Sequence, residues 1–465
     1  MLIEEMDDIA PVAAFAAMRR MAMPFILSGS PAWKRRYSYV GAAPVAVIRT
    51  EAGKTTSGTL VFRDPFEAVE TVLQKERDGW GGPLRHDMRS RKTAAGNGLS
   101  PFSGGAVGYL GYGLNGVIEP RLSVTRKGVT CVPDALIGIY ETVYVYDHEE
   151  ARGCLTSSGR DMAGFNKIKD LLRRAKTQTA PEPLRPSGGM AFNMTRGQYL
   201  RMIERAKAYI SAGDVYQINL AQRISVPVEG DPLSLFLRLL DEKPAPYPAF
   251  MDLGGFQIIS NSPELLLSVR GNGVETSPIK GTRPRGHTLA EDRAMINELK
   301  SSRKERAEHV MIVDLERSDL GRVCLPGSVE VAAFEAVESY EHLHHMASTV
   351  RGRLRPGITS AGALRSCFPG GSVTGAPKVR AMEIIAELEP EAREIYTGGM
   401  GWIGFDGEMD MAMTIRTAVV KDGELRLHVG GGIVADSAPE DEYAETMLKA
   451  RDFLEALGIA EARTA

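Results

Sequence analysis

Long apolar runs, paired cysteines and an excess of positive charge are all missing from this chain of 465 residues. The lack of about 18 uninterrupted apolar residues in a row excludes a membrane-spanning helix. The first residues, MLIEEMDDIAP, are acidic and do not have the basic and then apolar order of a signal peptide. A net charge of −3 and a pI near 6.3 argue against a nucleic-acid-binding protein, which would carry a basic stripe. We therefore expect a cytoplasmic protein that binds neither nucleic acid nor a membrane.

The cysteines are few and scattered: Cys131, Cys154, Cys324 and Cys367. They form no Cys-x-x-Cys pair, so neither a zinc site nor a redox pair is expected, and we interpret them as reduced packing residues. None lies in a Gly-x-Cys-x-Gly nucleophile turn. The phosphate-loop pattern G-x-x-x-x-G-K-[ST] is absent as well, because GGSVTGAPK has Ala and Pro where Lys and Ser or Thr would be needed. The glycine clusters therefore do not indicate ATP.

What remains is ordinary globular composition, 43% hydrophobic and 25% charged, enough for one or two large cores. Two polar segments rich in Pro and Gly divide the chain, a surface loop at residues 85–101 and a linker at residues 176–190. They predict an N-terminal region of residues 1–175 and a second region of residues 191–460. Strand and helix patterns do not alternate regularly along the chain. This favours an α+β fold over a doubly wound parallel sheet.

Several elements are predicted from local patterns. Helical periodicity covers residues 66–76, and a second helix begins at Thr195, with Gln198 completing a capping box, and ends at Gly213. Alternating apolar residues at 135–148 and in QINLAQRISVPV predict strands. A long helical pattern covers residues 289–315. The last helix is predicted to begin near Ser437, with Glu440 completing another capping box.

Two pairs of carboxylates have helical spacing. Glu305 and Glu308 are three residues apart, and so are Glu442 and Glu445, which Lys449 follows one turn later. A solvated helix face would explain either pair alone. Together the pairs could converge on one Mg²⁺, which prefers oxygen ligands and could hold a substrate carboxylate. Both interpretations stay open at this point.

Single residues raise similar questions. Arg416 is the one charge in the apolar segment MAMTIRTAVV, where it would need an internal partner or a carboxylate ligand. His345, in EHLHHM, could donate to a substrate hydroxyl or be a structural residue. Lys280, in PIKGTRPRG, could be a solvated surface charge or a nucleophile.

Taken together, the motifs settle these questions by resemblance. GDVYQINLAQR, SPELLL, PIKGTRPRG, AEHVMIVDLERSDLGR, FPGGSVTGAPKVRAMEII, YTGGMGWIG, and GGGIVADS followed by PEDEYAETMLKA occur in one order, preceded by FSGGAVGYLGYG. In this the chain resembles the chorismate-utilising enzymes: anthranilate synthases, aminodeoxychorismate synthases, isochorismate synthases and salicylate synthases. The resemblance covers nearly the whole chain. It implies two interlocked β-sheets, sandwich-like and flanked by helices.

The resemblance also implies roles for individual residues. Lys280, Glu264 and His345 would be catalytic, with Glu264 as the general acid and base. The substrate would be held by Gly281, Thr282, Thr374, Tyr396, Arg416, Gly430, Gly432 and Lys449. Magnesium would be held by Glu305, Glu308, Glu442 and Glu445. A tryptophan site would be formed by Ser28, Tyr37, Ser38, Pro246, Tyr247 and Pro248, although a packed sheet interface is an equal alternative for these residues.

Two positions discriminate among the family's activities. Isochorismate and salicylate synthases use a lysine at the position of Gln217 to activate water, so the glutamine disfavours that reaction. Anthranilate synthases carry alanine at the position of Lys280, whereas aminodeoxychorismate synthases carry lysine; Asn219 also resembles the latter. The resemblance thus implies formation of 4-amino-4-deoxychorismate through a covalent lysine intermediate. The alternatives are anthranilate synthesis and a non-catalytic relative, and the second is disfavoured because the carboxylates are all present.

The amino group must come from ammonia. Because the chain shows no glutaminase cysteine motif, the resemblance implies a separate glutamine amidotransferase partner.

Overall fold

The computed structural model describes residues 2–6, 9–33, 35–78, 100, 102–125, 130–175, 180–301, 303–340 and 343–459. At residues 31, 78, 123–125, 282 and 303–305 it describes the backbone and not the side chain. The predicted loop at 85–101 lies almost wholly outside these ranges, and so do the first four residues of the predicted linker. No helix in the described ranges is long and apolar enough to cross a membrane.

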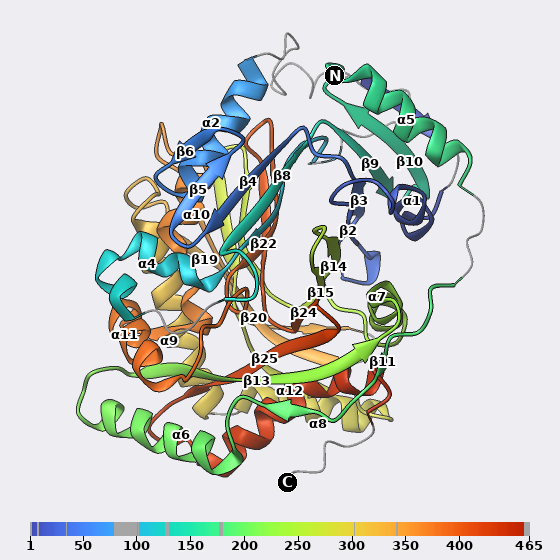
Figure 1. Ribbon diagram of the computed structural model, residues 1–465. Coiled ribbons are helices and arrows are strands. Elements are labelled where there is room, and N and C mark those ends of the chain that lie inside the picture. Colours follow the sequence, from blue (N-terminus) through green and yellow to red (C-terminus); the bar gives the residue numbers. More distant parts are fainter. Residues whose placement is uncertain are drawn as a thin grey trace.

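Two large antiparallel sheets form the centre of the molecule (Figure 1). The first sheet has the order β1 (Leu2–Met6), β10 (Arg152–Ser157), β9 (Thr142–Asp147), β3 (Tyr37–Gly41), β2 (Phe25–Leu27), β14 (Tyr247–Asp252), β15 (Gln257–Ser262), β24 (Thr417–Lys421), β25 (Glu424–Ile433), β13 (Gln217–Glu229) and β11 (Arg185–Pro186). Two short strands, β12 (Ala191–Phe192) and β21 (Gly375–Ala376), also pair with β13.

The second sheet has the order β18 (Ile279–Pro284), β20 (Leu343–Arg353), β17 (Gly273–Ser277), β16 (Leu265–Arg270), β23 (Met409–Met413), β22 (Gly399–Gly404), β7 (Gly105–Leu110), β8 (Ala135–Tyr140), β4 (Ala46–Glu51), β5 (Lys54–Ser57) and β6 (Leu60–Phe62). β19 (Glu330–Ser339) pairs with β20. Strands from residues 1–175 and from residues 191–460 occur in both sheets, so each sheet is built jointly. The division into these two regions stays a prediction.

The sheets interlock because the chain repeatedly passes from one to the other. β8 belongs to the second sheet and β9 to the first, although only Glu141 separates them. The chain crosses again between β15 and β16, at Pro263 and Glu264, and between β23 and β24, at Thr414 to Arg416. The single strand expected at 135–148 is thus two strands in different sheets. Each crossing brings a loop residue into the space between the sheets.

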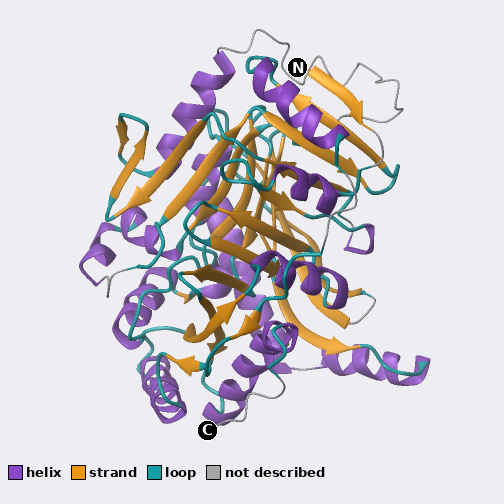
Figure 2. Cartoon of the chain, turned by 45° about the vertical axis from the view of Figure 1, so that its right-hand side comes forward, coloured by secondary structure: helices purple, strands orange, loops and turns teal. Residues whose placement is uncertain are grey.

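Helices cover the outer faces, and the strands occupy the middle (Figure 2). The longer helices are α1 (Pro11–Met18), α2 (Pro65–Asp78), α5 (Met162–Arg173), α6 (Arg196–Ser211), α7 (Pro232–Glu242), α8 (Leu289–Ser301), α9 (Arg303–Gly321), α10 (Ser360–Cys367), α11 (Lys378–Leu388) and α12 (Pro439–Ala456). Shorter ones are α4 (Asn115–Ile118) and the 3₁₀ turns η1 (Pro31–Trp33), η2 (Tyr112–Leu114), η3 (Pro120–Thr125) and η4 (Gly371–Val373).

Each sheet has its own hydrophobic core against these helices. One cluster joins the second sheet to α2, α9 and α10, and the other joins the first sheet to α1, α5, α7 and α12. In the latter, Phe15 and Phe250 are fully buried and meet edge to face with ring centroids 5.4 Å apart. Burying one such ring stabilises the fold by about 1.5–3 kcal/mol. The two cores hold the sheets in place around the crossings.

The predicted α+β class with two interlocked sheets and flanking helices is confirmed. The capping box of α6 is confirmed too, because the Thr195 and Gln198 side chains each accept a hydrogen bond from the other residue's backbone N–H. The capping box at Ser437 is wrong: α12 begins at Pro439, and the Ser437 hydroxyl donates to the Glu442 carboxylate at 2.6 Å. The pattern at residues 289–315 corresponds to two helices, α8 and α9.

Candidate active site

Two chain crossings place Glu264 and Arg416 in the same space between the sheets. The Glu264 carbonyl accepts from the Met413 N–H at 3.0 Å, and the Arg416 carbonyl accepts from the Asn261 N–H at 3.0 Å. The crossing loops are therefore hydrogen-bonded to each other on both sides. Residues in such loops do not pair with a strand of either sheet, so their side chains can face a ligand.

Glu264 is a buried carboxyl group, 6% exposed, and burial raises its pKa to about 7. A hydrogen bond from the Ser372 hydroxyl at 2.6 Å and the charges of Lys280 and Lys449 partly oppose this rise in pKa. A carboxyl group with a pKa near neutrality can both donate and accept a proton at physiological pH. This is the electrostatic setting that an acid–base residue needs.

Lys280 lies on edge strand β18, where its side chain is 19% exposed. Pairing with β20 shifts register between Lys280 and Thr282, so Gly281 is the extra residue of a β-bulge, with φ +78°. The bulge turns the lysine toward the glycines of β25. Its Nζ lies 4.0 Å from Glu308 Oε2, and a Cβ on Gly432 would be 3.5 Å away.

His345 faces the same bulge from β20, opposite Thr282. It is 2% exposed, and its ring hydrogen-bonds with the Gly281 backbone. Burial, together with the charge of Arg416, lowers the pKa of His345 to about 4. The imidazole is therefore neutral at physiological pH. A neutral ring can donate a hydrogen bond without adding a charge beside Lys280.

Arg416 is not within a strand, as the sequence suggested, but in the loop between β23 and β24, with a left-handed backbone at φ +46°. Burial lowers its pKa, and its guanidinium forms no ion pair with any residue that the structure describes. The expected internal salt bridge is thus missing from the described residues. A desolvated guanidinium of this kind suits a carboxylate ligand, which it can bind through two hydrogen bonds.

The glycines of β25 form one wall of the site. A Cβ at Gly430 would meet the Tyr396 hydroxyl at 2.8 Å and the Leu220 carbonyl at 2.4 Å, so a side chain would displace both. A Cβ at Gly432 would meet Gln217 Nε2 at 2.5 Å. Only glycine therefore lets the backbone of this wall lie so close to Tyr396 and Gln217. It lies beside the Tyr396 hydroxyl and beside Lys280.

Thr374 is a predicted ligand residue whose side chain is hydrogen-bonded within its own turn. It is fully buried, and its hydroxyl donates to the Gly370 carbonyl at 2.9 Å. Its carbonyl accepts from the Asn219 N–H at 2.8 Å. Thr374 thereby joins the turn at η4 to β13. The side chain of Thr282, another predicted ligand residue, lies outside the described part.

The predicted magnesium ligands come from α9 and α12. Glu442 is 4% exposed, and its Oε2 lies 3.4 Å from the Cβ position of Gly431, whereas Glu445 is bound to Lys449 at 2.7 Å. Lys449 also donates to the Gly430 carbonyl at 3.0 Å. The donor chemistry, carboxylates around the glycine wall, fits Mg²⁺. The Glu305 side chain lies outside the described part, and within that part no three His, Cys, Asp or Glu side chains are gathered closely enough to hold a metal.

Sequence reasoning missed Arg393 and Ser372. Arg393 is 2% exposed, is paired with Glu389 at 2.6 Å, and donates to the Asn219 carbonyl at 2.7 Å and the Val373 carbonyl at 3.1 Å. It thus fixes β13 and η4 relative to each other. A buried Glu–Arg pair four residues apart was the only available signal. Nothing in the sequence pointed to Ser372, because serine is common in glycine-rich turns.

The predicted tryptophan site is a hollow of about 420 Å³ between the sheets, and Ser28, Tyr37, Pro246, Tyr247 and Pro248 are among the residues that line it. Ser38 is fully buried beside it, hydrogen-bonded to the Gly29 N–H at 2.8 Å and to His148 at 2.7 Å.

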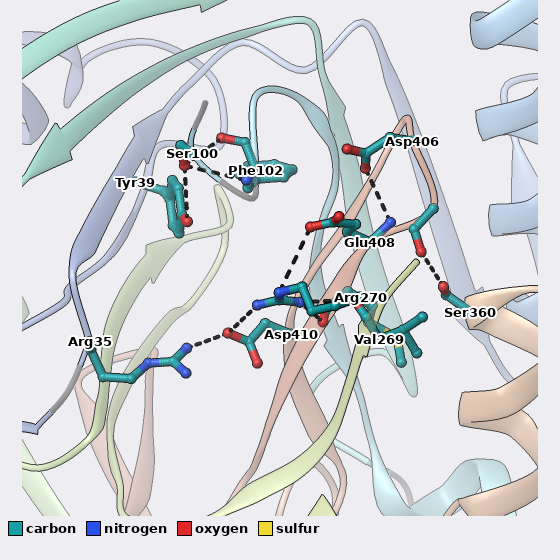
Figure 3. A network of polar contacts seen from close by, with 12 residues as sticks. Arg35, Tyr39, Ser100, Phe102, Val269, Arg270, Ser360, Asp406, Glu408 and Asp410 are labelled. Carbon is teal, nitrogen blue, oxygen red and sulfur yellow. Dashed lines mark hydrogen bonds and ion pairs between the residues drawn. The ribbon is translucent and has the colours of Figure 1, made fainter. Parts of the chain in front are cut away.

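Arg35 reaches into this hollow from the segment before β3. Its guanidinium lies 4.4 Å from the centroid of the Tyr247 ring and is paired with the buried carboxylate of Asp410. Arg270 approaches Asp410 from the other side, at 3.3 Å (Figure 3). The chain itself thus supplies a cation to the hollow.

Comparison with known proteins agrees with this fold. The sequence profile of the chorismate binding enzymes matches residues 23–455. The chain is 39% identical to anthranilate synthase component 1 of Streptomyces coelicolor over 98% of this chain and 88% of that protein. It is 38% identical to aminodeoxychorismate synthase component 1 of Bacillus subtilis over 92% of this chain and 91% of that protein.

Among solved structures, anthranilate synthase component I from Streptococcus pneumoniae TIGR4 is similar with a TM-score of 0.77 and 32% identity, over 96% of this chain and 98% of that one. The chain belongs to the family of chorismate-binding enzymes. Because relatives of both names have similar identities, overall similarity does not distinguish anthranilate synthesis from aminodeoxychorismate synthesis.

Proposed function

We propose that this chain is the chorismate-aminating component of an aminodeoxychorismate synthase. It would convert chorismate and ammonia into 4-amino-4-deoxychorismate and water, for 4-aminobenzoate and folate synthesis. The observation that carries the proposal is the placement of Lys280: the β-bulge at Gly281 turns its amine toward the bare glycine wall, within electrostatic reach of Glu264. A solvated surface lysine would instead extend its amine into water.

The first step is attack by the Lys280 amine on ring carbon C2. The C2–N bond forms, both conjugated ring double bonds shift, and the C4–O bond breaks as Glu264 gives its proton to the departing hydroxyl, which leaves as water. Attack requires the neutral amine. His345, neutral and beside the bulge, would hydrogen-bond near that hydroxyl.

The second step is attack by ammonia on C4. The C4–N bond forms, both double bonds return, and the C2–N bond to Lys280 breaks, so that the lysine is released and Glu264 can take up the surplus proton. Two displacements restore the original configuration at C4, which a single displacement would invert. Both steps need the ring held at fixed distances from Lys280 and Glu264.

The remaining residues would hold the substrate. The Arg416 guanidinium, which has no ion pair in the described part, would bind the carboxylate of the enolpyruvyl group, with the Tyr396 hydroxyl and the backbone of Gly430 and Gly432 beside it. Backbone at Gly281, Thr282 and Thr374 would border the ring.

Magnesium is proposed as the cofactor. Glu305, Glu308, Glu442 and Glu445 would hold it, with Lys449 nearby, and its positive charge would bind the ring carboxylate. Because Glu445 is bound to Lys449 without a ligand, we expect this pair to separate when the metal binds.

A glutamine amidotransferase subunit is proposed as the source of ammonia. Free ammonium should replace it in vitro. Anthranilate synthesis is the second candidate function, and the anthranilate synthase relatives at 37–40% identity favour it.

The test is the identity of the product made from chorismate, Mg²⁺ and ammonium. If an added aminodeoxychorismate lyase converts the product to 4-aminobenzoate, the proposal holds. If the product fluoresces as anthranilate without that lyase, the chain is an anthranilate synthase.

For the hollow at Arg35 we propose the packed-interface alternative. The guanidinium already satisfies Asp410 and covers Tyr247, so that a free tryptophan would have to displace a buried ion pair.

A further inference from the structure

A second buried carboxyl group lies behind Glu264, on helix α9. Glu316 is only 4% exposed, although carboxylates are almost never buried without a partner. It forms no ion pair with any described residue, and the proposed reaction does not use it. Its surroundings connect it to the site by a short path.

The path runs through the turn η4. The Gly371 backbone N–H interacts with the Glu316 carboxyl group and lowers its pKa. A Cβ at Gly371 would be 3.1 Å from Glu316 Oε1 and 2.6 Å from Leu315 Cδ2, so only glycine lets the turn lie this close to α9. The next residue, Ser372, donates its hydroxyl to Glu264 Oε1 at 2.6 Å. Consecutive residues of one turn therefore join the two carboxyl groups.

The charged and titratable groups that face Glu316 come from four elements. Asp319 lies one turn on in α9, Lys378 begins α11, Cys367 ends α10, and Glu264 lies at the crossing between the sheets. Lys378 is bound to Asp319 and donates to the Cys367 and Pro369 carbonyls at 3.0 and 2.8 Å. Asp319 is paired with both Lys378 and Arg322, and the charge of Lys378 opposes only part of the rise in the pKa of Glu316.

Burial and the charge of Asp319 raise the pKa of Glu316 to about 8. Glu316 is therefore still protonated while Glu264, with a pKa of about 7, titrates. Protonated Glu316 still offers a carbonyl oxygen to the Gly371 N–H. It does so without placing a second negative charge near Glu264. The turn is anchored, and Glu264 remains the only carboxylate of the two that ionises near neutrality.

We propose that Glu316 is a positioning residue for Glu264: by holding the Gly371 N–H it fixes the turn at η4, and the turn keeps the Ser372 hydroxyl on the Glu264 carboxyl group. The inference rests on the proposed function only in that Glu264 is the acid. Glu316 acts through Ser372 and does not touch the substrate.

The experiment is a double-mutant cycle measured as chorismate consumption, whatever the product. Glu316→Leu removes the acceptor for Gly371 and is expected to lower kcat about tenfold, the effect of losing one hydrogen bond, with KM within about twofold of wild type. In a Ser372→Ala background the same substitution should lower kcat by less than about twofold, because the path is already broken. Glu316→Gln retains an oxygen acceptor and should stay within about threefold of wild type.

The matched control is Asp314→Asn, on the same helix but with its side chain 63% exposed, and it should have no effect. Equal losses from Glu316→Leu with and without Ser372 would overturn the proposal, as would a folded Glu316→Leu enzyme with wild-type kcat.

If Glu316→Leu does not fold, Glu316→Gln decides by its pH profile. In wild type the charge that develops on Glu316 above about pH 8 opposes further ionisation of Glu264, and Glu316→Gln lacks that charge. Activity of Glu316→Gln must therefore fall more steeply there than that of wild type. Matching profiles would contradict the proposal.

If wild type consumes no chorismate, the proposed function fails separately. The same cycle is then measured as the free energy of unfolding in urea, where additive effects would overturn the positioning role.

Discussion

The raised pKa of Glu264 leads to a quantitative prediction about pH. Burial moves the pKa of this carboxyl from its usual 4.5 to about 7. At pH 7 about half of the molecules carry the proton that the reaction needs, whereas an unshifted carboxyl would be protonated in about 0.3% of them. Burial therefore raises the working fraction roughly 150-fold. Above pH 7 this fraction falls tenfold for each pH unit, and the rate limited by proton donation should fall with it.

The Ser372 hydroxyl provides the perturbation. Its hydrogen bond to Glu264 lowers the pKa, so Ser372→Ala should move the basic limb of the kcat profile to higher pH. The control is Ser260→Ala, a buried serine on β15 whose hydroxyl contacts Thr417 instead, and it should leave the limb in place. Ionisation of ammonia contributes equally to all three profiles, so the difference between them reports Glu264.

Removing the carboxyl group should separate activity from stability. Glu264→Gln is expected to lower kcat by about 10²–10⁴-fold, the usual contribution of a general acid. The folded pKa lies above the unfolded one, so the burial penalty is absent below about pH 4.5 and complete above about pH 7, where it is about 3 kcal/mol. Glu264→Gln should therefore unfold at higher urea concentration than wild type at pH 8, with the difference shrinking toward pH 5. Superimposable kcat profiles for wild type and Ser372→Ala, or a fully active Glu264→Gln enzyme, would refute the reasoning.

Three further predictions concern the substrate, the metal and the hollow. Arg416→Gln should raise KM for chorismate about 10–100-fold through the loss of charge-assisted hydrogen bonds, without lowering the free energy of unfolding, because Arg416 has no ion pair to lose in the described part; an unchanged KM would remove it from the site. Chelation with EDTA should abolish turnover and added Mg²⁺ should restore it, and Glu442→Gln should raise the Mg²⁺ concentration needed for half-maximal activity at least about tenfold; turnover in EDTA would argue against the metal. Calorimetry should detect no tryptophan binding to wild type, whereas Arg35→Ala, which leaves Asp410 with Arg270 as its remaining partner and opens the hollow, should gain affinity for amine-bearing aromatic ligands; wild-type binding of tryptophan would contradict occupancy by Arg35.

The sequence predicted the class of fold because its ordered motifs carry that information, and α6 with its capping box because both hydrogen bonds are local. It could not predict that residues 135–148 change sheets at Glu141, because alternation of apolar residues is the same in either sheet. The predicted capping box at Ser437 was wrong for a related reason, although the helix begins close by, at Pro439. A serine that could cap a helix can equally bind a carboxylate, and Glu442 offered one.

The sequence predicted which residues form the site but not the contacts between them. Lys280, Glu264 and Arg416 were named from motifs, but the bulge at Gly281 and the loop position of Arg416 depend on long-range pairing. The link from Glu316 through η4 to Glu264 joins residues more than fifty positions apart. Only the folded chain brings them together.

The central claim is that Lys280 forms a covalent bond to the substrate. The most direct measurement is intact-protein mass spectrometry after wild type and Lys280→Ala are each mixed with chorismate and Mg²⁺ without ammonia, so that the intermediate accumulates. The account predicts an added mass of chorismate less one water on wild type, mapped to Lys280, lost when ammonium is added and never seen on Lys280→Ala. Wild-type turnover with no adduct, yielding anthranilate once ammonium is supplied, would contradict it.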